Sequence, residues 1–193
     1  MHAVRRAAAS DVVDVVVVVA PAAACDEVRL LLKPLVEDVI VVPGGSERQD
    51  SVRLGLEALP DDVDVVLVHD AARCLTPPGV FVAVVDAVRA GAPAVIPVLP
   101  VSDTVKRVSG RAVVETVDRS ELVAVQTPQG FAAQTLRAAH AAAAPGAAAT
   151  DDAGMLEALG HPVLVVAGHE HAFKVTRPVD LVLARALLAE EAP

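Results

Sequence analysis

At 193 residues the chain is long enough for one domain with a substantial core and too short for two, so residues 1–193 are interpreted as a single domain. Hydrophobic residues make up 54% of the chain and aromatic residues only 2%, which favours small branched side chains packed in a sheet under alanine-rich helices. The formal net charge of -9 excludes general electrostatic attraction to nucleic acid or anionic membranes, so a phosphate ligand would need a local basic pocket.

The first residues resemble a signal peptide, with an apolar run at residues 15–24. Asp11 and Asp14 argue against this interpretation, and the run is far below the roughly 20 residues that cross a bilayer. The two cysteines, Cys25 and Cys74, form no CxxC motif, which is typical of a reducing compartment. We therefore expect a cytoplasmic protein without a membrane or nucleic-acid partner.

Helix and strand patterns alternate along the chain. Periodicity and β-branched runs predict, in order, helix 2–10, strand 12–20, helix 26–35, strand 38–42, helix 48–59, strand 63–68, helix 80–90 and strand 94–98. Helices 132–144, 151–159 and 179–188 follow, with strand 162–166 and the extended segment 173–176 between them. This alternation predicts an α/β fold with a mostly parallel sheet flanked by helices, whose ligands bind at the carboxyl ends of the strands.

Capping residues support several of these boundaries. Thr76 followed by Pro77 is expected to begin the helix over 80–90, and Gly91 to end it. Thr150 is expected to cap the helix over 151–159, and Pro178 to start the last helix.

One segment departs from the alternation. Residues 104–117 form two extended stretches around Ser109 and Gly110, which predicts a β-hairpin within an arm over about 102–120. Charged residues alternate with valines in it, so it is too polar for a central strand. Both an arm that reaches a partner subunit and a solvent-facing edge hairpin fit this pattern.

Two loops follow strands at the predicted ligand edge. In PGGSERQDS, residues 43–51, the glycines permit close approach of the backbone to a flat or anionic ligand. An ordinary turn, in which Ser46 or Asp50 caps the following helix, also fits, and the motif alone favours it. In HDAAR, Asp70 is well placed to hold Mg²⁺ on nucleotide phosphates, or alternatively to cap the following turn.

Three further residues are candidates for ligand contacts. Arg119 and Lys174 each follow a strand-like segment and could clamp a phosphate, although surface solubility explains most single basic residues. Thr127, in the polar turn QTPQGF, could meet a ligand hydroxyl, or the segment could be a loop fixed by Pro128.

Seven motifs in order carry a family resemblance: GGSERQDSV, LVHDAAR, PVSDTVKR, TVDRSEL, QTPQGF, TDDAGMLEALG and FKVTRPVDL. Together they resemble the 2-C-methyl-D-erythritol 4-phosphate cytidylyltransferases of non-mevalonate isoprenoid synthesis, over essentially the whole chain. The resemblance implies a Rossmann-like fold and transfer of CMP from CTP to methylerythritol phosphate with release of pyrophosphate. It also implies Mg²⁺ and a homodimer with exchanged β-arms.

The resemblance further implies roles for individual residues. Asp70 would lie by the metal and substrate, and Arg119, Lys174 and Asp70 would be the catalytic residues. Nucleotide contacts would come from Gly44, Gly45, Ser46, Ser51 and Ala71. The acceptor phosphate would meet Arg73, Thr104 and Arg119, some across the dimer, and its sugar-alcohol end Thr127, Thr150 and Lys174.

The chain departs from the family pattern at its start. The family begins with a strand and a glycine-rich loop of the type PAAGxGxR, followed by a PK lysine, which together wrap the triphosphate; this sequence begins at the first helix. We expect a missed upstream start or a fragment in preference to a genuine short form, because every later motif is intact. Loss of the arginine of this loop and of the PK lysine should lower the rate of catalysis by orders of magnitude.

Two alternative functions remain open from the sequence. The same fold could serve a cytidylyltransferase with another acceptor, such as ribitol 5-phosphate. The missing loop would also fit a non-catalytic dimeric protein that binds nucleotides.

Overall fold

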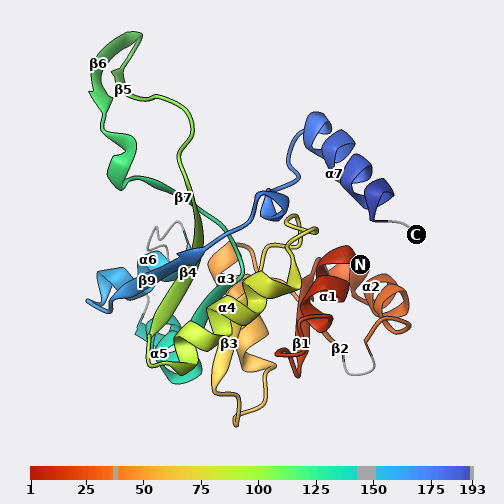
Figure 1. Cartoon of the computed structure of the whole chain (residues 1–193). Helices are drawn as coiled ribbons and strands as arrows, with labels where there is room; N and C mark the ends of the chain where they lie inside the picture. The colour runs from red at the N-terminus through yellow and green to blue at the C-terminus, as the bar shows by residue number, and fades with distance from the viewer. Residues whose placement is uncertain (37–38, 143–150, 192–193) are drawn as a thin grey trace.

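The computed structural model describes residues 1–36, 39–142 and 151–191 of the chain (Figure 1). The helices are α1 (His2–Ala8), α2 (Cys25–Leu32), α3 (Arg48–Glu57), α4 (Pro78–Arg89), α5 (Ala133–Ala142), α6 (Asp152–Ala158) and α7 (Pro178–Glu190). The strands are β1 (Val16–Ala20), β2 (Val39–Pro43), β3 (Val65–Val68), β4 (Ala94–Pro100), β5 (Val105–Ser109), β6 (Ala112–Val117), β7 (Val123–Val125), β8 (Gln129–Ala132) and β9 (Val163–Ala167). Short 3-10 turns are η1 (Ala22–Ala24), η2 (Arg119–Glu121) and η3 (Glu170–Ala172).

Within the described ranges, the strands form two sheets and a hairpin. Strands β1 and β2 pair in parallel, and the larger sheet has the order β3-β8-β4-β7, with β9 paired in parallel to β4. Strand β8 runs antiparallel between β3 and β4, with Val68 opposite Gln129 and Ala94 opposite Phe131. The predicted α/β fold, a sheet flanked by helices, is confirmed.

Alternate residues of the larger sheet enter two cores on its opposite faces. Val66 of β3 and Ile96 of β4 pack with α3, α5 and α6, whereas Leu67 and Val95 face α4. This period of two is the pattern of a strand buried on both faces. A third, smaller core covers β1 and β2 with α2.

Helix α4 follows from its local sequence. Its buried side chains recur along one face, at Val80, Phe81, Val84, Val85 and Val88. It ends before Gly91, whose φ of 109° is in the region that favours glycine.

Two predicted helix caps are wrong. For α4 the N-cap is Pro77 and the first helical residue Pro78, whereas the Thr76 hydroxyl donates to the carbonyl of Arg73. For α6 the N-cap is Asp151, whose side chain accepts a hydrogen bond from the N–H of Gly154. The predicted cap Thr150 lies outside the described residues.

Two segments differ from their predicted conformation. Residues 129–131, expected to lie in a polar turn, belong to the buried strand β8, which also takes in residue 132, the expected start of a helix. Its Gly130 packs so closely that a Cβ there would lie 2.3 Å from Val84 Cγ1 of α4, which explains why a glycine occupies a buried strand. Residues 173–176, expected to be extended, belong to the loop between η3 and α7 and to no strand.

A cavity of about 1030 Å³ lies between the two sheets. Valine side chains of β1 and β3 line it, together with α1 and the loop that follows β3. Within the described residues, β1 pairs with β2 alone and β3 with β8 alone, so the strand edges that face this cavity are unpaired.

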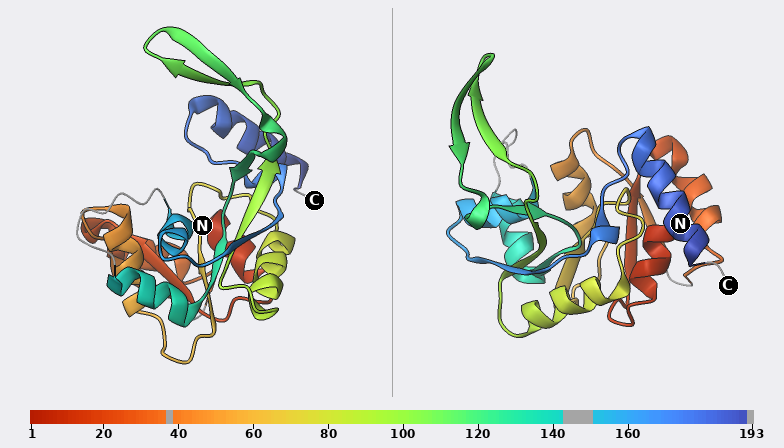
Figure 2. Two further views of the ribbon diagram at one scale, coloured as in Figure 1. Left: turned by 90° about the vertical axis from the view of Figure 1, so that its left-hand side faces the viewer. Right: turned by 45° about the horizontal axis from the view of Figure 1, so that its top comes forward.

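The predicted β-hairpin is formed by β5 and β6 and projects from the body (Figures 1 and 2). Gly110 takes a φ of 57° at its turn, as expected for the Ser-Gly pair. Val108, Val113 and Val114 are exposed on it. Among the described residues, no helix combines the length and apolar character needed to cross a membrane.

Candidate active site

The turn formed by residues 44–51, called the glycine turn below, is held by contacts within itself. The Ser51 hydroxyl accepts the N–H of Gly45 at 3.1 Å and donates to the carbonyl of Glu47 at 3.1 Å. The Ser46 hydroxyl donates to Asp50 Oδ2 at 3.0 Å. These short-range bonds close the loop between β2 and α3 into a fixed shape.

The cap of α3 differs in part from the prediction. Its N-cap is Glu47 rather than Ser46, and Asp50 at the third helical position completes a capping box by accepting the backbone N–H of Glu47. Gly45 cannot carry a side chain without a shift of the turn, because a Cβ at this position would lie 2.3 Å from Asp50 Cβ. The glycine therefore allows the turn to close tightly against the first turn of α3.

The antiparallel pairing of β3 and β8 brings the end of one strand to the start of the other. Thr127, two residues before β8, therefore lies beside His69 and Asp70, which follow β3. Its hydroxyl accepts the backbone N–H of Asp70 at 3.1 Å and lies 2.9 Å from His69 Nδ1. With one acceptor role occupied, this hydroxyl can donate to Nδ1, which leaves the ring proton on Nε2.

His69 is held as a neutral side chain. Burial lowers its pKa to about 4, against the opposing charge of Asp70. Its ring packs edge-on against Phe81, with centroids 5.1 Å apart. Nε2 is buried and has no hydrogen-bond partner among the described residues.

Asp70 is the centre of a small charged cluster with Arg73 and Lys174. Lys174 Nζ lies 2.9 Å from Asp70 Oδ2, and Arg73 Nε lies 3.8 Å from the same oxygen. Two cations around one carboxylate leave a net positive charge, which favours a phosphate ligand. Lys174 is half-exposed and can turn towards such a ligand.

Arg73 also joins segments that are far apart in the chain. Its Nη1 donates to the carbonyl of Ala172 at 2.8 Å, and Nη2 donates to that of Val125 at 3.1 Å. Burial lowers the pKa of this guanidinium, with Asp70 opposing the shift. Val175 N–H bonds to the carbonyl of Ala72 at 2.9 Å, which fixes the loop that carries Lys174.

Several residues expected at the site are brought together. Asp70, Arg73, Thr127 and Lys174 form one contact network. Ser51, Asp70 and Ala71 line the same cavity, whose wall also includes Arg48 and His69. Gly44, Gly45 and Ser46 belong to the turn that Ser51 closes.

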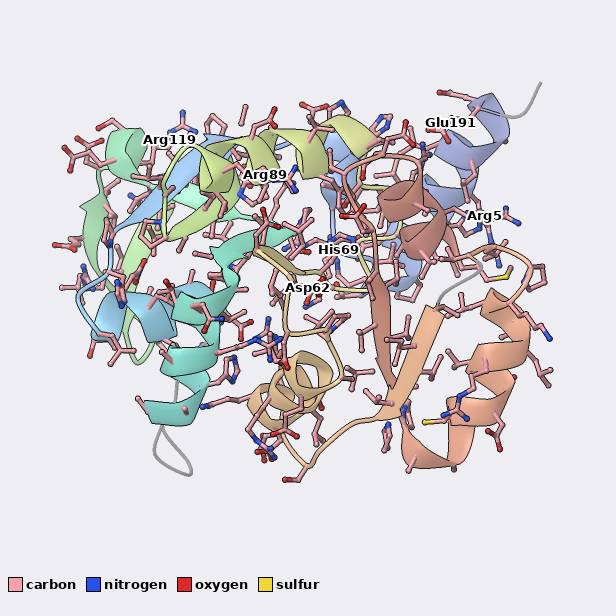
Figure 3. All side chains as sticks on the ribbon, turned by 90° about the horizontal axis from the view of Figure 1, so that it is seen from below. Arg5, Asp62, His69, Arg89, Arg119 and Glu191 are labelled. Atoms are coloured by element: carbon pink, nitrogen blue, oxygen red, sulfur yellow. The ribbon has the colours of Figure 1, made fainter. Side chains whose placement is uncertain are left out.

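Two expected residues lie elsewhere. Arg119 is at the base of the arm, where its guanidinium contacts the carbonyls of Val101 and Ser102, and Figure 3 shows it well away from His69. Thr104 is exposed just before β5. Their roles stay predictions, as does that of Thr150, which lies outside the described residues.

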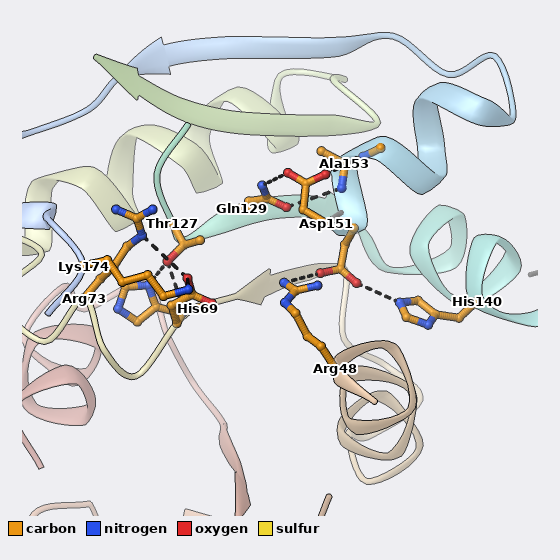
Figure 4. A network of polar contacts seen from close by, with 12 residues as sticks. Arg48, His69, Arg73, Thr127, Gln129, His140, Asp151, Ala153 and Lys174 are labelled. Carbon is orange, nitrogen blue, oxygen red and sulfur yellow. Dashed lines mark hydrogen bonds and ion pairs between the residues drawn. The ribbon is translucent and has the colours of Figure 1, made fainter. Parts of the chain in front are cut away.

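Sequence reasoning missed a second polar network next to the site (Figure 4). It joins Arg48, Gln129, His140, Asp151 and Asp152, which come from different elements. The acidic pair in TDDA was a possible signal, because consecutive aspartates at a helix start can bond in different directions.

Comparisons with known families and sequences identify the family of the chain. The chain matches the family model described as IspD, 2-C-methyl-D-erythritol 4-phosphate cytidylyltransferase, over residues 1–190. It is 56% identical over 200 residues to the 2-C-methyl-D-erythritol 4-phosphate cytidylyltransferase of Streptomyces avermitilis, and the match covers 98% of this chain and 79% of that relative.

Solved structures give the same result. The chain is similar to 2-C-methyl-D-erythritol 4-phosphate cytidylyltransferase from Thermus thermophilus, with a TM-score of 0.82 and 40% identity over 96% of this chain and 87% of the other. It is also similar to 4-diphosphocytidyl-2C-methyl-D-erythritol synthase from Anaerococcus prevotii, with a TM-score of 0.89 and 26% identity over 97% and 87% of the two chains.

Proposed function

The chain belongs to the 2-C-methyl-D-erythritol 4-phosphate cytidylyltransferase family, and we propose that the site described above transfers CMP from CTP to 2-C-methyl-D-erythritol 4-phosphate and releases pyrophosphate. The observation that carries this proposal is the positive cluster of Asp70, Arg73 and Lys174, next to the cavity that Ser51 and Asp70 both line. An exposed glycine turn next to the cavity and a phosphate-attracting cluster suit a nucleotide and an anionic acceptor.

The chemistry requires two polyanions to meet. An oxygen of the acceptor phosphate attacks the α-phosphorus of CTP, and the bond to the β-phosphate breaks as pyrophosphate leaves. Lys174 and Arg73 would reduce the repulsion between the reactants, and Thr127 would orient the acceptor. Positioning and charge neutralisation lower such a barrier without a covalent enzyme intermediate.

We propose Mg²⁺ as the cofactor, held at Asp70. The ion pairs described for Asp70 use Oδ2, and within the described residues Oδ1 remains available to a cation. Mg²⁺ on a nucleotide commonly takes one or two carboxylates and fills its other positions with phosphates and water, so one carboxylate is compatible with it. The ion would neutralise charge on the triphosphate.

We further propose a homodimer in which the arm completes the partner's site. Arg119 and Thr104 stand at the arm, apart from the Asp70 cluster, and the arm exposes Val108, Val113 and Val114. Exchange of arms would bury these valines and bring Arg119 to the acceptor phosphate of the second copy. A cytoplasmic location is proposed as well, supported by the free thiols of Cys25 and Cys74.

Pyrophosphate release tests the activity. With CTP, Mg²⁺ and 2-C-methyl-D-erythritol 4-phosphate, we expect release that requires all three. Equal kcat/KM with ribitol 5-phosphate would overturn the proposed acceptor. CTP binding without release, both in this chain and in a chain that also carries the family's glycine-rich loop, would favour a non-catalytic nucleotide-binding protein.

Subunit mixing tests the exchanged arm. We expect Arg119→Ala to raise the KM of the acceptor or lower kcat while CTP affinity stays nearly unchanged. If Arg119 acts across the dimer, mixing Arg119→Ala chains with Lys174→Met chains restores turnover, because each mixed dimer then holds one complete site. No recovery in mixtures that exchange subunits would contradict the arrangement.

A further inference from the structure

Asp152 is a fully buried carboxylate at the first residue of α6. Its Oδ2 forms an ion pair with Arg48 Nη2 at 2.7 Å, and its Oδ1 lies 3.0 Å from His140 Nε2 (Figure 4). Arg48 comes from α3 and His140 from α5, so one carboxylate joins three helices. A buried charge is tolerated when partners of this kind surround it.

The charge state of Asp152 fits this arrangement. Burial is the strongest influence and favours the neutral acid, but the hydrogen bond from His140 and the charge of Arg48 together outweigh it and lower the pKa of Asp152. The carboxylate is therefore ionised at neutral pH, its Oδ1 accepts the hydrogen bond from His140, and its Oδ2 is paired with the Arg48 guanidinium. Its two oxygens point in fixed, different directions.

Arg48 connects this carboxylate to the glycine turn. It is the first residue of α3 and follows Glu47, the N-cap whose backbone N–H and carbonyl bond to Asp50 and Ser51. A shift of the Arg48 backbone moves Glu47 and the turn with it, because the two residues are adjacent. The ion pair thus sets where the turn stands relative to α6.

The other side of α6 is tied to the strand that carries the acceptor side of the site. Gln129 Nε2 donates to Asp151 Oδ2 at 2.7 Å, and Gln129 Oε1 accepts the N–H of Ala153 at 3.4 Å. Gln129 begins β8, two residues after Thr127, which bonds to Asp70. Asp152 is therefore linked through Arg48 to the glycine turn. The preceding residue, Asp151, is linked through Gln129 to the strand that follows Thr127.

We propose that Asp152 is a positioning residue, which holds Arg48 and thereby fixes the distance between the glycine turn and β8. This distance allows the nucleotide to bind beside its acceptor. This inference rests on the proposed function for the identity of the ligands. Asp152 itself is fully buried and acts through Arg48. A turn anchored in this way is ordered before the ligand arrives, which reduces the entropy lost on binding.

Binding and kinetics of four variants test the proposal. We expect Asp152→Asn and Arg48→Met each to weaken CTP binding in calorimetry about 10-fold and to raise the KM of CTP more than they lower kcat. The double variant should be no worse than either single one, because both remove one interaction. Asp152→Glu keeps the charge and should recover part of the affinity.

Matched controls separate this effect from general loss of charge. Arg53→Met removes another α3 arginine, paired with Glu57 on the surface, and Asp26→Asn removes an exposed partner of Arg29. Both should bind CTP as the native chain does. Additive losses in the double variant, or native CTP affinity in Arg48→Met, would overturn the proposal.

Amide hydrogen exchange decides the inference independently of activity. Asp152→Asn should speed exchange in residues 44–53, although the substitution lies in α6, and Arg48→Met should do the same. Unchanged exchange there in a folded variant would refute the link. If Asp152→Asn does not fold, Arg48→Met decides, since the Arg48 side chain is partly exposed and contributes little to the core. If the native chain binds no CTP, the proposed function fails while the exchange result still decides the link.

Discussion

The glycine turn and the Asp70 cluster lie at one cavity but are stabilised in opposite ways. The turn depends on bonds between residues four and six apart, such as Ser46 to Asp50 and Gly45 to Ser51. The cluster depends on bonds across 57 and 99 residues, from Asp70 to Thr127 and from Arg73 to Ala172. The difference indicates that the shape of the turn follows from neighbouring residues, with its place set by the long-range ion pair of Arg48 and Asp152, whereas the cluster itself can change only with the packing of the larger sheet.

The largest expected effect is on chemistry in the cluster. Lys174→Met should lower kcat by about 100- to 1000-fold, because it removes a preorganised cation from the reacting phosphates. Stability should hardly change, since Lys174 is half-exposed. Steady-state pyrophosphate release measures the first effect and urea unfolding the second. Lys33→Met, an exposed site just after α2, is the control; native turnover in Lys174→Met would refute the assigned role.

A second substitution tests the long-range character of the cluster. Arg73→Ala should lower the free energy of unfolding by about 3 kcal/mol, because the carbonyls of Ala172 and Val125 lose their charged donor. Arg73→Lys should recover little, since one ammonium cannot replace the two donors of the guanidinium. Urea unfolding followed by circular dichroism measures both, and a loss below about 0.5 kcal/mol would show that the cluster does not depend on this link.

The pH dependence of stability probes His69. In the unfolded chain its imidazole titrates near 6.5, whereas in the fold the pKa is about 4. The unfolded state therefore binds more protons between these values, and stability is intact above 6.5 and lost as the pH falls towards 4. Relative to His69→Gln, the native chain should lose about 2 kcal/mol between pH 7 and 4.5.

Urea midpoints at both pH values measure this difference. His161→Gln is the control, because His161 is exposed. Equal pH dependence of the native chain and His69→Gln would mean that His69 is not held neutral by the fold.

The smallest expected effect tests the local contacts of the glycine turn. Gly45→Ala forces a Cβ against Asp50, so the turn must move, at a cost of about 1 kcal/mol and a several-fold loss of CTP affinity. Gly79→Ala is the matched control, since nothing lies within 4 Å of its new Cβ. Calorimetric titration with CTP and thermal unfolding measure the two effects; a Gly45→Ala chain with native CTP affinity would show that the turn's backbone is not in contact with the nucleotide.

Local features were predictable from the sequence because their causes lie within a few residues. The helix end at Gly91, the hairpin turn at Gly110 and the closing of the glycine turn by Asp50 all follow from neighbours in the chain. Asp70 and Arg73 were predictable as well, since a strand that ends in polar residues delivers them to the edge where such sheets bind ligands.

Other features could not be predicted, because the local sequence pattern favours a different structure. QTPQGF is typical of a polar turn, yet burial between β3 and β4 makes residues 129–132 a strand, with Gln129 satisfied by Asp151 and Ala153. The caps of α3 and α6 moved by one residue, to Glu47 and Asp151, because several oxygens near each helix start compete for the same N–H groups. The periodicity of hydrophobic residues does not show which of these oxygens will form the cap.

The sequence by itself determined the helices, most of the strands, the hairpin and the family, because periodicity and ordered motifs act within short stretches. Only the tertiary structure decided that Thr127 meets His69 and Asp70, that Lys174 reaches Asp70, and that Arg48 pairs with Asp152. These contacts join segments brought together by the antiparallel insertion of β8 and by burial in a shared core. Packing selects such pairs from many possible partners, and no local pattern of residues specifies which partner is chosen.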